Sequence, residues 1–101
     1  MKINLDYTFH QLSGEPVRWK DDTQDLTLKT VLAESLLSSY KDEQIEGAEK
    51  ASRYKLAMRI FKANDDVELS AEEIVLLKRL IAKMFSVLVT GQAWEYIEKT
   101  N

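Results

Sequence analysis

The strongest constraint on the fold is a long apolar segment with a well-marked start in the last third of the chain. Ser70 and Glu73 have the spacing of a capping box, in which each side chain accepts a hydrogen bond from the other residue's backbone N–H. From Ala71 to about Val89, apolar residues recur at three- and four-residue steps and cover nearly half of a helical circumference. They are Leu76, Leu77, Leu80, Ile81, Met84, Phe85, Val87 and Leu88. A helix with so wide an apolar face is either the central helix of a domain or part of a subunit interface.

The acidic residues just before this helix raise the alternative of a calcium-binding loop. Counted from Asn64, an EF-hand loop would need glycine at its sixth position and glutamate at its twelfth. The sequence has Leu69 and Val75 there. We therefore interpret the stretch as a helix start, and we expect the protein to use no metal and no cofactor.

An earlier segment also has the pattern of an amphipathic helix. Asp25 or Thr27 can cap its N-terminus, and the apolar periodicity continues to about Tyr40. The residues that recur at helical spacing are Leu28, Val31, Leu32, Leu36 and Tyr40. This pattern predicts a helix that packs on one side against the core.

A further helix is predicted from about Glu46 to Ala63, and it has two apolar stripes. One stripe consists of Ala51, Tyr54, Met58 and Phe61, and the other of Leu56 and Ile60. Two stripes predict two sets of neighbours. Near the end of the chain, Gly91 can stop the long apolar helix or mark only a kink, and a short last helix can follow it.

The N-terminal segment has the pattern of strands. Apolar residues alternate from Ile3 to Phe9, a turn sequence follows at residues 13–16, and Val17 and Trp19 alternate again. This pattern predicts a β-hairpin, which must pack on helices because an isolated hairpin is only marginally stable. The predicted fold is a single α+β domain over residues 1–101, mainly α. In it, a hairpin and turn in residues 1–25 pack on three to four helices in residues 26–101.

Composition narrows the classes of function. The chain has no cysteine, which excludes thiolate metal sites and thiol nucleophiles. His10 is the only histidine, and the sequence contains neither a nucleophile elbow around a serine nor a glycine-rich phosphate loop. We therefore expect no enzyme. Because no apolar run approaches the roughly 20 residues of a membrane span and the N-terminus lacks the pattern of a secretory signal, we expect a cytoplasmic protein without membrane contact.

Basic residues in the segment from Glu46 to Ala63 suggest a second class of function. Lys55, Arg59 and Lys62 share a sector of about 60 degrees on a helix, which could contact nucleic acid. The formal net charge of −3 opposes this interpretation. Elsewhere on the same helix, Arg53 stands at helical distance from Glu49, which predicts an ordinary surface ion pair.

The order of several short motifs resembles a known group of proteins. The motifs are "LSGEPV", "DLTLKTVLAESLL", "EKASRYKLAMRI", "ELSAEEIVLLKRLIAK" and "VTGQAWEYIE", and together they cover nearly the whole chain. This succession resembles a loose group of small bacteriophage and prophage proteins that are mostly of unassigned function. The resemblance implies a phage origin and brings no active site with it.

These observations favour a non-enzymatic phage accessory protein that binds a viral or host protein in the cytoplasm of a bacterial host. The alternative is a small nucleic-acid-binding regulator. The apolar surface of the two longest helices exceeds what a small bundle needs, which predicts a homodimer or a hetero-complex unless the hairpin covers it. The predicted interface residues are Leu56, Ile60, Leu76, Leu80, Met84 and Val87.

Overall fold

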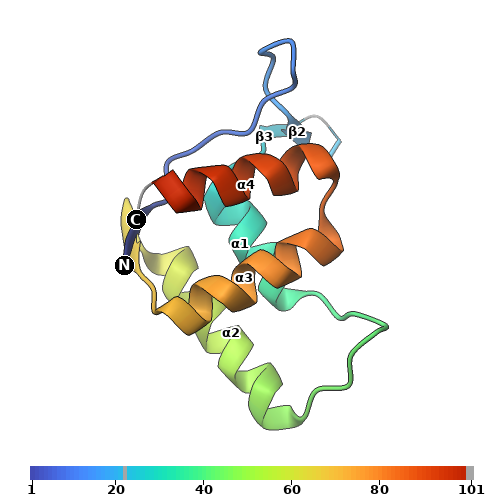
Figure 1. Ribbon diagram of the computed structural model, residues 1–101, viewed down its shortest axis with the longest axis vertical. Helices are drawn as coiled ribbons and strands as arrows, with labels where there is room; N and C mark the ends of the chain where they lie inside the picture. The colour runs from blue at the N-terminus through green and yellow to red at the C-terminus, as the bar shows by residue number, and fades with distance from the viewer. Residues whose placement is uncertain (22, 100–101) are drawn as a thin grey trace.

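The computed structural model describes residues 1–21 and 23–99 of the 101-residue chain. Within these residues it contains four helices: α1 (Leu28–Leu37), α2 (Gly47–Lys62), α3 (Ala71–Met84) and α4 (Val87–Lys99) (Figure 1). Its short strands are β1 (Lys2–Asn4), β2 (Arg18–Trp19), β3 (Gln24–Asp25) and β4 (Asp66–Glu68). The predicted class, mainly α with a small β part, is confirmed.

The strands do not pair as one simple hairpin. β1 pairs antiparallel with β4, which lies between α2 and α3, so that Ile3 stands opposite Val67. Both of these residues are buried, and this pairing places them on the same side of a two-stranded ribbon against the core. The predicted hairpin pairing is limited to the residues next to the turn, where the Val17 N–H donates to the Phe9 carbonyl at 2.9 Å and the Gln11 N–H donates to the Glu15 carbonyl at 2.7 Å. The Phe9 N–H donates instead to the Leu26 carbonyl at 2.9 Å. β2 pairs with β3.

Helix α1 begins at one of the two predicted caps and ends earlier than predicted. The Thr27 side chain accepts a hydrogen bond from the Thr30 N–H. The helix ends at Leu37 instead of Tyr40, because Ser38 is already extended. The Tyr40 hydroxyl then turns back and donates to the Ser35 carbonyl at 2.7 Å, so Tyr40 remains half-buried against the core beyond the helix.

The predicted capping box at the start of α3 is confirmed. The Glu73 N–H donates to the Ser70 hydroxyl at 3.1 Å, and the Ser70 N–H donates to the Glu73 carboxylate at 2.8 Å. The end of α3 was predicted wrongly at about Val89. The helix stops at Met84, and α4 begins immediately afterwards with the Ser86 hydroxyl accepting from the Val89 N–H at 3.3 Å. Gly91 therefore lies inside α4 and does not end a helix.

We expect Ser70→Ala to lower the free energy of unfolding by about 1 kcal/mol, because the Glu73 N–H at the start of α3 would lose its acceptor. Urea denaturation monitored by circular dichroism measures this change. Ser52→Ala is the matched control, because Ser52 is exposed in the interior of α2 and caps nothing. Equal midpoints for wild type and Ser70→Ala would contradict the role of the cap.

One side of helix α3 is buried in the core. Leu77, Leu80 and Ile81 are fully buried. α1 packs against both α2 and α3, and α4 packs against α3 (Figure 1). The wide apolar face in the sequence is thus explained by packing inside the chain.

No helix in the described ranges is long and apolar enough to cross a membrane.

Candidate functional site

The predicted interface residues do not form one exposed surface. Leu56, Ile60 and Leu80 are buried in the core, so their prediction as interface residues is wrong. They belong to the core in which α1 packs on both α2 and α3, and a single helical pattern does not reveal this packing. Leu76 and Met84 are half-buried, and Val87, which begins α4, is 92% exposed.

The stripe of α2 that contains Tyr54, Met58 and Phe61 is the one that faces solvent. Tyr54 is 57% exposed and Phe61 is 65% exposed, and half-buried Met58 stands between them at helical spacing. The opposite side of the helix supplies its core residues, including Leu56 and Ile60. Two aromatic side chains on one line of a surface helix are therefore each more than half exposed.

Helix α1 extends this surface, because it runs antiparallel beside α2. At one end, exposed Leu37 lines the same pocket as Tyr54. At the other end, the Lys29 ammonium donates to the carbonyls of Phe61 at 3.0 Å and Ala63 at 2.6 Å, which satisfies the C-terminus of α2. The same ammonium lies 5.8 Å from the centre of the Phe61 ring. We call the surface formed by Leu37, Tyr54, Met58 and Phe61 the α1–α2 face.

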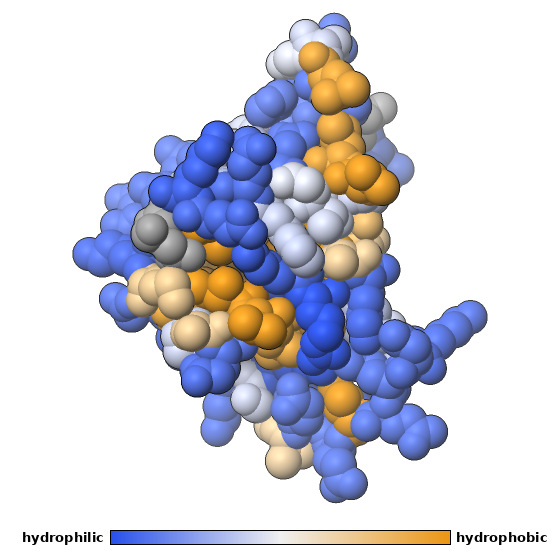
Figure 2. Space-filling view, in the orientation of Figure 1, coloured by the Kyte–Doolittle hydropathy of each residue, from blue (hydrophilic) through white to orange (hydrophobic). Residues whose placement is uncertain are grey.

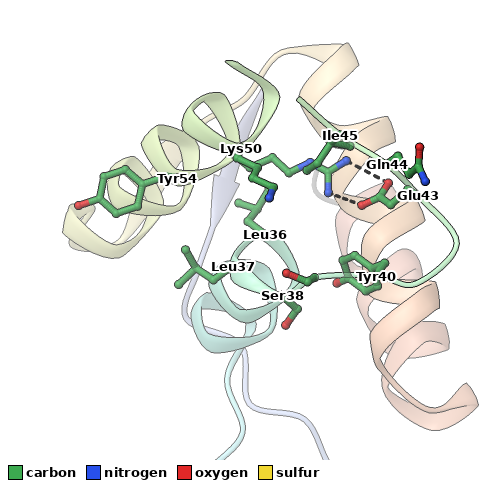
Figure 3. A pocket seen from close by; sticks show the side chains of 11 residues that line it. Leu36, Leu37, Ser38, Tyr40, Glu43, Gln44, Ile45, Lys50 and Tyr54 are labelled. Atoms are coloured by element: carbon green, nitrogen blue, oxygen red, sulfur yellow. Dashed lines mark hydrogen bonds and ion pairs between the residues drawn. The ribbon is translucent and has the colours of Figure 1, made fainter. Parts of the chain in front are cut away.

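A pocket opens at the Leu37 end of this face. It has a volume of about 440 Å³ and lies between the end of α1, the segment 38–46 and the first turns of α2 (Figure 3). Leu36, Ile45 and the rings of Tyr40 and Tyr54 provide apolar lining. Figure 3 shows Lys50 extending from α2 toward Leu36. The pocket can accept an apolar side chain whose neighbour is negatively charged.

One wall of the pocket is an ionic network centred on Arg53, whose side chain is only 3% exposed. Its guanidinium donates to both carboxylate oxygens of Glu43, at 2.6 and 3.2 Å, and to Glu49 at 3.1 Å. Arg79 and Lys83 on α3 approach Glu43 from the other side, at 3.4 and 3.7 Å. The hydrogen bonds from Arg53 lower the pKa of Glu43 to about 2. The segment 38–46 is thereby fastened to both α2 and α3.

The unpaired charge that α2 contributes to the α1–α2 face is positive. Helix α2 contains one acidic residue, Glu49, and this carboxylate is bound to Arg53. Lys55 and Lys62 are exposed on the side of the stripe away from α1, roughly 80 to 100 degrees around the helix from Tyr54. On the α1 side, lysines at positions 29 and 50 border the same apolar row. The apolar residues of the α1–α2 face are therefore flanked by lysines on both sides.

The three residues predicted to contact nucleic acid differ in their surroundings. Lys55 and Lys62 are exposed as expected. The Arg59 guanidinium instead donates to the Glu73 carboxylate at 2.7 Å and to the Glu68 carbonyl at 3.2 Å. Arg59 thus links α2 to the start of α3.

Other exposed apolar residues form weaker candidates. Figure 2 shows one apolar patch along the 10–16 loop and the start of α4, where Leu12 and Val87 are exposed, and another between α3 and α4. In the second region, the Trp94 indole N–H donates to the Lys78 carbonyl at 3.1 Å, and the Lys78 ammonium lies 5.2 Å from the Trp94 ring. An ion pair from Lys78 to Glu98 at 2.8 Å bridges the two helices. Charged side chains therefore already cross this region along the helices, whereas on the α1–α2 face only Lys29 crosses, at the Phe61 end, among the described contacts.

Among residues 1–21 and 23–99, no group of three or more histidine, aspartate or glutamate side chains is placed to hold a metal ion.

Comparison with known proteins finds no matching family model, no matching curated protein and no matching solved structure.

Proposed function

We propose that this protein is a non-enzymatic accessory protein of the bacteriophage type, which acts by binding a viral or host protein through the α1–α2 face. The observation that carries the proposal is the exposure of Tyr54 and Phe61 on one line with Leu37, next to a pocket. Aromatic side chains contribute much of the binding energy in protein interfaces. A contiguous exposed apolar surface is uncommon on a soluble monomer unless it binds something.

The α1–α2 face is well suited to binding because it is rigid. The opposite sides of both helices are buried in the core, and the ionic network at Arg53 fastens the segment that lines the pocket. A preformed surface loses little conformational entropy on association. Binding energy from a few aromatic contacts is then sufficient for a specific complex.

The alternative of a nucleic-acid-binding regulator has less support. Arg59, one of its three predicted contacts, is bound to Glu73, and only Lys55 and Lys62 remain for phosphates. The apolar row between the lysines offers nothing that a phosphate backbone can use.

Affinity capture from phage-infected and uninfected bacterial cells tests the proposal. We expect wild type to retain a protein that the double variant Tyr54→Ser/Phe61→Ser loses. Binding of the purified pair should weaken about 100-fold in the double variant, as the loss of two interface aromatics predicts. Both residues are exposed, so circular dichroism should show an intact fold.

Leu12→Ser/Val87→Ser is the matched control, because both residues are exposed and lie outside the face. We expect this control to retain the partner. A partner that the Tyr54→Ser/Phe61→Ser variant keeps and the control loses would overturn the assignment of the face.

A further inference from the structure

We infer that the occupant of the α1–α2 face is an acidic amphipathic helix of the partner protein, an inference that rests on the proposed function. Its apolar side would lie on the line from Leu37 to Phe61, and its carboxylates would meet the flanking lysines. Three features of the face support this inference: its shape, its charge and the pocket at its end.

The shape of the face fits a helix. Two antiparallel helices lie side by side, and a third helix can pack its ridge along the groove between them. From Lys50 to Phe61, α2 rises by roughly 16 Å, which corresponds to about three turns of a partner helix. Anchors at positions i, i+4 and i+7 of such a helix match the spacing of Tyr54, Met58 and Phe61.

The charge of the face selects acidic partners. Among the described ion pairs, none involves Lys50, Lys55 or Lys62, whereas the basic residues at 53 and 59 are paired. The chain as a whole is negative, so this positive face is a local feature and not a consequence of composition. Carboxylates on the partner would be attracted to it and would set the orientation of docking.

The same charges argue against a second copy of this chain as the occupant. A two-fold interface places the same surface on both sides, so rows of lysine would face rows of lysine. Like charges in contact cost free energy, and no acidic side chain of α2 is free to relieve them, since Glu49 is bound to Arg53.

The pocket gives the partner helix one deep anchor. Leu36, Leu37 and Ile45 surround space for a leucine or phenylalanine side chain, and Lys50 stands at its edge. A carboxylate one turn from that apolar residue would reach the Lys50 ammonium. The partner segment should therefore carry a large apolar residue near one end with a glutamate or aspartate beside it.

The test uses a synthetic helical peptide of about 15 residues, with leucine and phenylalanine on one face and glutamate on both flanks. A second peptide has lysine in place of each glutamate. We expect fluorescence anisotropy to detect binding of the acidic peptide only. Affinity should fall about tenfold or more in Lys55→Glu/Lys62→Glu and should weaken with added salt.

Lys20→Glu/Lys99→Glu is the matched control, because it changes the net charge equally at exposed positions away from the face. We expect it to bind the acidic peptide within about twofold of wild type. Equal binding of the acidic and basic peptides would overturn the inference. So would tighter binding to phosphatidylserine vesicles or duplex DNA than to the acidic peptide.

The natural partner from affinity capture separates this inference from the proposed function. If Tyr54→Ser/Phe61→Ser abolishes its binding and Lys55→Glu/Lys62→Glu leaves it unchanged, the face binds a protein and the acidic helix is wrong. If both variants bind as wild type does, the proposed function fails as well. Loss of binding in both variants, with retention in Lys20→Glu/Lys99→Glu, supports both.

Discussion

Replacing Phe9 by alanine is expected to lower the free energy of unfolding by about 4 kcal/mol, the largest effect that we predict for a single substitution. The Phe9 side chain is fully buried, and its ring meets the edge of Tyr7 at 5.0 Å between centroids. Its backbone is hydrogen-bonded on both sides, to Val17 and to Leu26. Because these bonds hold the N-terminal segment in place, the cavity left by the ring cannot readily collapse.

Urea denaturation of wild type and Phe9→Ala measures this change as a lower midpoint. Leu12→Ala is the matched control, because Leu12 belongs to the same segment and is 98% exposed. We expect the control to stay within about 0.5 kcal/mol of wild type. If the two variants were equally stable, the N-terminal segment would not be packed on the helices.

Glu43→Gln is expected to cost about 2 kcal/mol, because the buried guanidinium of Arg53 would lose its bidentate carboxylate. The cost is below that of breaking a fully buried pair, since Glu43 keeps 13% of its side-chain exposure and Glu49 still binds Arg53. The loss should also loosen the segment 38–46, which can be followed by faster hydrogen exchange of its amides.

Because of Glu43, we also expect part of the free energy of unfolding to depend on pH. The pKa of Glu43 is lowered from 4.5 to about 2 in the folded chain, chiefly by hydrogen bonds from Arg53. The folded state therefore gains stability from this group above pH 4.5, and the gain disappears as the pH falls from about 4.5 to about 2. Glu43→Gln should lose less stability than wild type between pH 7 and pH 3, because glutamine does not titrate.

Unfolding in urea at the two pH values measures this difference. Glu15→Gln is the control, because Glu15 is exposed and lies on the 10–16 loop away from the network. It should retain the acid sensitivity of wild type. A Glu43→Gln variant that also retained the full wild-type sensitivity would contradict the assignment.

Local signals in the sequence predict the starts of helices well. Thr27 and the pair Ser70–Glu73 cap helices because a side chain reaches a backbone N–H only two or three residues away. The break between α3 and α4 was missed, although Ser86 has a hydroxyl suited to an N-cap. Gly91 indicates a helix end instead, because glycine is common there, but α4 continues through it with Val89 and Ala93 buried on either side.

Contacts between distant residues could not be predicted from these patterns. Alternation identifies the Ile3 segment as a strand, yet nothing local indicates that its partner is Val67 and not Val17. A helical wheel likewise separates the two stripes of α2 without showing which one is buried. The stripe with Tyr54 and Phe61 is the exposed one because the stripe with Leu56 and Ile60 is buried in the core, where α2 packs on α1.

Ion pairs, too, can be predicted from the sequence only when their partners are close in the chain. The pair Arg53–Glu49 follows from helical spacing and is present at 3.1 Å. The burial of Arg53 and its stronger contact with Glu43 do not follow, because they depend on how the segment 38–46 folds back over α2. The ionic wall of the pocket therefore could not be predicted from the sequence, whereas the apolar stripe of α2 beside it could.

The pairing of β1 with β4 has a consequence for synthesis on the ribosome. Ile3 is made before its partner Val67, which is added 64 residues later. At typical translation rates this delay lasts roughly 3 to 13 seconds. During that time β1 is an unpaired strand edge with its apolar side open to other nascent chains or chaperones. β1 can pair only after α1 and α2 have been synthesised, because both helices lie between it and β4 in the sequence.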